Sequence, residues 1–190
     1  MADDLNVMKL KGKLMYAKLF QPDTRFDPKW TADVLLDAQG LEEAQKANLR
    51  VKKNDKWGDL FDGYDGSYVR VERPTTNFAG EERDPPVVKD AKVRDVPSST
   101  GVGNGTDAYV RFLVKTQDNR GNQMSPAEAH KKYGGYGMFL TGVQIVNLVP
   151  YERSSDPDTD FVEEDGDFDI GGNGGFEAVG DAPFDDELPI

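Results

Sequence analysis

The chain of 190 residues contains no cysteine and only one histidine, His130. The absence of cysteine excludes disulfide bonds, thiolate metal ligands and cysteine nucleophiles, and it fits a protein from a reducing compartment. A single histidine gives little support for a catalytic triad or a multi-histidine metal site. The sequence therefore predicts a protein that is not an enzyme and needs no metal or other cofactor.

Long apolar runs are absent as well. No stretch approaches the roughly 20 consecutive apolar residues that a transmembrane helix needs. Residues 1–13 carry charges and contain no apolar run, so the sequence predicts no signal peptide. We therefore expect a cytoplasmic protein that makes no contact with a membrane.

Lysine and arginine are missing from residues 154–190, which hold 13 of the 35 acidic residues. Residues 1–153 keep the other 22 acidic residues against all 23 basic ones, so they are close to neutral and the net charge of −12 belongs to the tail. A segment of Asp, Glu, Gly and Pro with scattered aromatics buries too little apolar surface to offset the entropy of ordering it. The sequence predicts one globular domain over residues 1–153 and a disordered acidic tail over 154–190.

Hydrophobicity with a period of two dominates the predicted domain and indicates β-strands with one buried face. In residues 7–15 three lysines alternate with apolar side chains, and Gly12 on the apolar side predicts a bend or bulge. The nearly continuous apolar run 138–149 predicts a central strand covered on both sides. Further strands are predicted at residues 30–36, 68–73 and 108–116.

Few helices are expected. Asp37 is a predicted N-cap for a helix that extends to about Leu49, and a short helix is predicted from Ser125. About five strands, one or two short helices and long loops predict a mainly β protein, most economically an OB-fold-like five-stranded barrel. The pattern leaves a jelly roll or a β-sandwich open. The long polar connections are residues 52–67, 74–86 and 97–106.

The outward positions of the predicted strands combine cations with aromatic rings. A single nucleic-acid strand needs this combination, because cations contact phosphates and flat rings stack on unpaired bases at about 1–3 kcal/mol each. Two loops, residues 50–57 and 131–137, repeat the mixture. Exposed lysines can also form an ordinary solvated surface, and Trp57 or Tyr68 can be core residues. We predict nucleic-acid contacts at Lys9, Lys11, Lys13, Lys52, Lys53, Lys56, Trp57, Tyr68, Arg70, Tyr109, Arg111, Lys115, Lys131, Lys132, Tyr133 and Tyr136.

The segment Phe184-Asp185-Asp186-Glu187-Leu188-Pro189-Ile190 resembles the acidic tip of bacterial and phage single-stranded DNA-binding proteins. In that tip an acidic cluster precedes a bulky apolar residue, a proline and a final apolar residue. This sequence has Ile190 where the bacterial tip has phenylalanine. The body resembles a family of bacteriophage single-stranded DNA-binding proteins with an OB-fold, chiefly through Gly137-Met138-Phe139-Leu140-Thr141-Gly142-Val143-Gln144-Ile145-Val146, although it lacks the compact spacing of the bacterial domain.

The resemblance implies a protein that coats single-stranded DNA without sequence preference during phage DNA replication or recombination, in the host cytoplasm. It implies recruitment of replication or recombination proteins through the tip, at Asp185, Asp186, Glu187, Leu188, Pro189 and Ile190. Self-association on DNA would need contacts between neighbouring copies, which the sequence does not identify. A tethered acidic segment can also compete with phosphates for basic residues of its own domain. The alternative from a different class is an acidic interaction protein that mimics DNA and buffers a basic partner.

Overall fold

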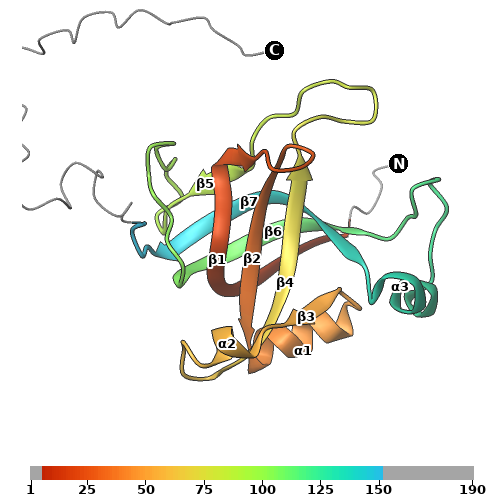
Figure 1. Cartoon of the computed structure of the whole chain (residues 1–190), viewed down its shortest axis with the longest axis horizontal. Helices are drawn as coiled ribbons and strands as arrows, with labels where there is room; N and C mark the ends of the chain where they lie inside the picture. Colours follow the sequence, from red (N-terminus) through yellow and green to blue (C-terminus); the bar gives the residue numbers. More distant parts are fainter. Residues whose placement is uncertain (1–5, 152–190) are drawn as a thin grey trace, which may run out of the picture. The chain divides into compact units, whose positions relative to one another are not determined.

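The computed structural model describes residues 6–151. The elements of this part are β1 Val7–Asp23, β2 Lys29–Asp37, α1 Ala38–Lys46, β3 Val51–Lys53, α2 Asp55–Gly58, β4 Tyr64–Pro74, β5 Val87–Lys89, β6 Thr106–Lys115, α3 Pro126–Tyr133 and β7 Gly137–Asn147 (Figure 1). None of these helices combines the length and hydrophobicity that a membrane span requires. The predicted acidic tail, its tip and the domain boundary after residue 153 lie outside the described residues.

Five long strands close into a barrel. β1 pairs antiparallel with β2 and β6, β2 pairs with β4, and β6 pairs with β7. The barrel closes where β4 and β7 run parallel, with Glu72 beside Phe139. The short strands β3 and β5 extend the sheet by pairing with β4 and β7. This arrangement confirms the predicted OB-fold-like five-stranded barrel, and its closure excludes the jelly roll and the sandwich, which are built from two sheets.

The barrel interior is filled by the apolar side chains that the alternation predicts. Leu10 and Leu14 of β1 are fully buried, whereas Lys9 and Lys11, on either side of Leu10, are exposed. The remaining strands contribute the fully buried Val34, Val69, Val71, Val110, Phe112 and Leu140. Figure 1 shows α1 and α2 at one end of the barrel, and the loops β1–β2 and β4–β5 at the other end.

The sequence predicts a bend or a bulge at Gly12, and the structure has no bulge there. The β1–β6 ladder runs regularly through Gly12, which lies opposite Ala108. Gly12 is instead required by close packing, because a Cβ at this position would overlap the Leu35 carbonyl oxygen and lie 2.7 Å from Val34 Cγ1. The irregularity of β1 occurs further on, at Tyr16, whose φ of 49° accompanies a register shift against β2.

Two helix boundaries follow from local hydrogen bonds. The predicted N-cap is confirmed, since the Gly40 amide donates to Asp37 Oδ1 at 2.8 Å. The helix ends at Lys46 and not near Leu49, because Asn48 takes a positive φ of 52°. The predicted helix from Ser125 is confirmed as α3, which Ser125 starts with a capping box.

The prediction that the strand over residues 138–149 is covered on both sides is wrong. β7 forms part of the barrel wall, so only one side of it faces the core. Met138, Leu140 and Val143 are buried, whereas Thr141 and Gln144 lie outward and half-buried. The long connection 52–67 also holds regular structure, because it contains α2 and most of β3.

Candidate nucleic-acid interface

A basic groove lies between β4 and the segment that joins β6 to β7. Its volume of ≈ 210 Å³ is below the range of about 300–1,000 Å³ that is usual for small-molecule sites. Two carboxylates, Glu72 and Asp118, belong to its lining. The cationic and aromatic side chains of the basic groove are Arg50, Lys52, Arg70, Lys115 and Tyr133.

Barrel closure brings these side chains together. The parallel contact between Glu72 and Phe139 places β4 beside β7, and Lys115 at the end of β6 lies opposite Gly137 at the start of β7. Gly137 has no side chain, so Lys115 extends across β7 toward β4. On the other wall Lys52 of β3 lies opposite Tyr68 of β4. Segments distant in the sequence therefore form the two walls of one groove.

The Tyr133 ring lies at the end of α3 and contacts two cations. The ring centroid is 5.5 Å from Arg50 Cζ and 5.2 Å from Lys132 Nζ. Gly134 ends the helix in the left-handed region, with a φ of 76°, which fixes Tyr133 at the margin of the basic groove. Arg50 Nε is buried and donates no hydrogen bond within residues 6–151.

An aromatic cluster adjoins the basic groove at Lys52. It consists of Tyr16, Trp57 and Tyr68: the Trp57 ring lies 4.6 Å from Tyr68 and 5.8 Å from Tyr16 between centroids. The four-residue helix α2 carries Trp57 over the outer face of β4. Tyr16 is 61% exposed and was not predicted from the sequence. The break in alternation after Met15 is the signal that could have identified it.

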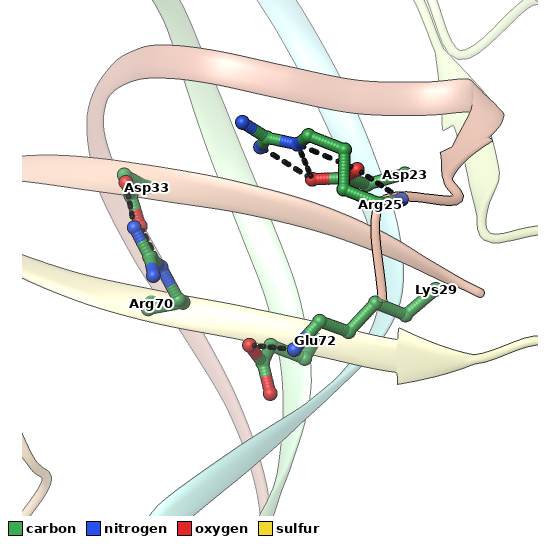
Figure 2. A network of polar contacts seen from close by, with 6 residues as sticks. All are labelled: Asp23, Arg25, Lys29, Asp33, Arg70 and Glu72. Atoms are coloured by element: carbon green, nitrogen blue, oxygen red, sulfur yellow. Dashed lines mark hydrogen bonds and ion pairs between the residues drawn. The ribbon is translucent and has the colours of Figure 1, made fainter. Parts of the chain in front are cut away.

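Carboxylates pair with several cations on the outer face of β2 and β4. Arg70 donates from Nε to Asp33 Oδ1 at 2.6 Å and from Nη2 to Asp33 Oδ2 at 2.7 Å, and Lys29 pairs with Glu72 at 2.7 Å. Figure 2 shows both pairs together with the exposed pair Arg25–Asp23. Pairing with Asp33 raises the pKa of Arg70. The charge of Arg70 is therefore largely neutralised within the protein.

The charge of Lys115, unlike that of Arg70, is not neutralised by a partner in the described part of the chain. The walls of the basic groove desolvate its ammonium group and so lower its pKa, an effect that Glu72 opposes and the nearby Arg83 and Arg50 reinforce. Within residues 6–151 Lys115 forms no ion pair. A phosphate beside Lys115 would compensate for both unfavourable effects.

The structure divides the residues predicted from the sequence into separate groups. Lys52, Arg70, Lys115 and Tyr133 line the basic groove, and Trp57 and Tyr68 form the aromatic cluster. Lys9, Lys11, Tyr109 and Arg111 lie on the outer face of β1 and β6 instead. Lys131 and Lys132 line a neighbouring hollow together with Asp118 and Glu128.

The remaining predicted residues have other local partners. Lys13 pairs with Asp107 at 2.8 Å, Lys53 pairs with Asp65 at 3.1 Å, and Lys56 is exposed on α2. Tyr136 is only 7% exposed, and its hydroxyl donates to the Met124 carbonyl at 2.9 Å. Tyr136 is thus packed as a core residue, and we leave it out of the proposed interface. Arg50, which is absent from the predicted set, takes a place in the basic groove.

No protein-family model matches the chain, and no curated protein matches it in sequence. Solved structures of phage proteins match its fold. The C-terminally truncated single-stranded DNA-binding protein from bacteriophage Enc34 superimposes with a TM-score of 0.51 at 12% identity, covering 78% of this chain and 90% of that chain. The Enc34 protein in complex with ssDNA gives a TM-score of 0.50 at 11% identity, covering 78% of this chain and 91% of that chain. The structure of gp2.5, a single-stranded DNA-binding protein encoded by bacteriophage T7, superimposes with a TM-score of 0.48 at 15% identity, covering 84% of this chain and 96% of that chain.

Proposed function

We propose that this protein binds single-stranded DNA along the basic groove and the aromatic cluster, without reading the base sequence. The observation that carries the proposal is the position of these residues on the barrel. OB-folds bind oligonucleotides on the face of their second and third strands and at the loops 1–2 and 4–5. Here β2 and β4 are the second and third long strands, and the segment after Lys115 joins the fourth to the fifth.

The chemistry of the site fits the same ligand. Arg50, Lys52 and Lys115 contact phosphates, and the rings of Tyr133 and Trp57 stack on bases. Neither kind of contact distinguishes one base from another, so binding has little sequence preference and weakens with salt by about 0.7 log units per log salt for each phosphate neutralised. The Enc34 protein, whose solved complex contains ssDNA, supports this class of ligand.

The biological role that we infer is the coating of exposed strands during phage DNA replication or recombination in the host cytoplasm. Residues 185–190 recruit replication or recombination proteins in this proposal. Their three carboxylates and the sequence Leu188-Pro189-Ile190 suit a partner pocket that is apolar and rimmed by basic residues. The proline limits the entropy that the segment loses on binding.

Fluorescence of Trp57 tests the proposal. Trp30 is a core residue whose Nε1 makes no hydrogen bond in the described part, so Trp30→Phe leaves Trp57 as the sole reporter and removes no hydrogen bond. We expect oligo-dT to quench the emission of this variant at low salt, because a base stacks on the Trp57 ring. The reciprocal variant Trp57→Phe, in which the buried Trp30 remains, will show no quenching. Unchanged Trp57 emission with excess oligonucleotide would favour the DNA-mimic alternative.

Releasing Arg70 from its carboxylate partner is expected to tighten binding. Asp33→Asn preserves an oxygen acceptor for Arg70 Nε but removes the negative charge that competes with phosphate. The affinity for oligo-dT should rise, and the slope of log affinity against log salt should steepen by about 0.7, which is one additional phosphate contact. Glu43→Gln, on the exposed side of α1, makes the same change in net charge and serves as the control. Equal effects of the two substitutions would show that Arg70 has no specific part in binding.

A further inference from the structure

A second concentration of positive charge lies outside the basic groove, on the outer face of β1 and β6. This cationic face consists of Lys9, Lys11, Arg111 and Tyr109. In the β1–β6 ladder Lys9 lies opposite Arg111, and Lys11 lies opposite Tyr109. The three cations are exposed, and none of the four residues lines the basic groove.

The cations of this face have polar neighbours but no counter-ions. Lys9 Nζ donates to Gln144 Oε1 at 3.4 Å, and Arg111 Nη1 donates to Thr141 Oγ1 at 3.0 Å. Within residues 6–151 none of Lys9, Lys11 and Arg111 forms an ion pair. Like charges directly opposite each other in a ladder are destabilising. The arrangement of Lys9 and Arg111 is therefore unfavourable for folding and favourable for holding an anion.

Tyr109 positions the two lysines on this face. Its ring centroid lies 4.4 Å from Lys9 Nζ and 5.9 Å from Lys11 Nζ, so one ring contacts both ammonium groups. These contacts hold the long lysine side chains close to the sheet. They reduce the conformational entropy that the lysines would lose on binding a phosphate.

β6 connects the cationic face to the basic groove. Arg111 and Lys115 both point outward from this strand, and four residues of strand separate their Cα atoms by about 13 Å. A nucleic-acid strand that passes Lys115 can continue along β6 to Arg111 and then to Lys9. Protein interfaces are depleted of lysine in their centres, so a surface of this composition suits a phosphate backbone better than a protein partner.

We propose that the cationic face is a second phosphate-binding track, which the same DNA strand occupies once it is long enough to leave the basic groove. This inference rests on the proposed function, and it adds a path around the barrel. Site sizes of single OB-folds span about 4–16 nucleotides. A strand confined to the basic groove belongs at the short end of that range, and a strand on both surfaces belongs at the long end.

The test compares short and long oligo-dT on the full chain. The variant Lys9→Gln, Lys11→Gln, Arg111→Gln should bind a strand of about 6 nucleotides as the unchanged protein does, since this strand fills only the basic groove. Its affinity for a strand of about 20 nucleotides should fall on the order of tenfold, and the salt slope for that strand should fall by about 2, corresponding to three lost phosphate contacts. The charge-preserving variant Lys9→Arg, Lys11→Arg, Arg111→Lys should retain the slope.

Other results would overturn the inference. Equal weakening of the short and long strands would mean that the cationic face belongs to one common site. No change with either strand would mean that the face does not bind DNA, and tighter binding of both would indicate that it holds the acidic residues 154–190. Failure of the unchanged protein to bind even the short strand would contradict the proposed function itself.

Discussion

Replacing Lys52 and Lys115 by glutamate is expected to lower the affinity for single-stranded DNA on the order of 100-fold at low salt. The two lysines occupy opposite walls of the basic groove, so the double substitution removes phosphate contacts from both walls and adds repulsion at each. Lys115 contributes because it forms no ion pair within residues 6–151, so its charge is available to a phosphate. The measurement is a titration of labelled oligo-dT, followed by fluorescence anisotropy.

A variant with the same change in net charge separates this local effect from the overall field of the protein. Gln39→Glu, Gln45→Glu and Lys46→Glu place the added negative charge on exposed positions of α1, outside the basic groove. We expect this variant to bind within about threefold of the unchanged protein when the titration is repeated at about 0.15 M salt, where the Debye length is about 8 Å and exposed charges further away are largely screened. A comparable loss in both variants would show that the basic groove is not where DNA binds.

Gly12→Ala is expected to lower the free energy of unfolding by about 3 kcal/mol. The added Cβ would overlap the Leu35 carbonyl oxygen and lie 2.7 Å from Val34 Cγ1. β1 cannot move away from β2, because on its other side it is paired with β6 through Ala108. The overlap must therefore separate strands that form the barrel wall, and chemical denaturation will measure the loss.

Gly137→Ala is the matched control. The nearest atom to a Cβ at Gly137 is Cδ of the flexible Lys115, at 3.6 Å, which is an ordinary contact. We expect the free energy of unfolding to change by no more than about 0.5 kcal/mol, as for most surface substitutions. Equal stability of the Gly12→Ala and Gly137→Ala proteins would show that β1 and β2 are not closely packed at Gly12.

Much of the fold could be predicted because its signals are local. Alternation identified the buried side of β1, and Asp37 marked the start of α1 as an N-cap. The short strands β3 and β5 were not predicted, because three residues are too few for a period to be visible. Barrel closure between Glu72 and Phe139 joins distant parts of the chain and left no local sign in the sequence.

The sequence predicts which kinds of residue bind the ligand, but it does not predict which of them lie together on one surface. Alternation shows that a side chain points outward, but in a closed barrel outward positions lie all around the circumference. Arg70 and Arg111 therefore looked equivalent in the sequence, although one lines the basic groove and the other lies on the cationic face. The pairing of Arg70 with Asp33 depends on the β2–β4 register, which alternation does not fix.

The basic groove crosses the joint of the barrel. β4 and β7 meet there at the pair Glu72 and Phe139, with Arg70 on one side and Lys115 on the other. A ligand that contacts both sides bridges this joint and holds the ring of strands shut. If the groove binds DNA as proposed, occupancy and barrel integrity are linked by mass action: bound DNA stabilises the closed barrel, and opening of the joint lowers the affinity for DNA.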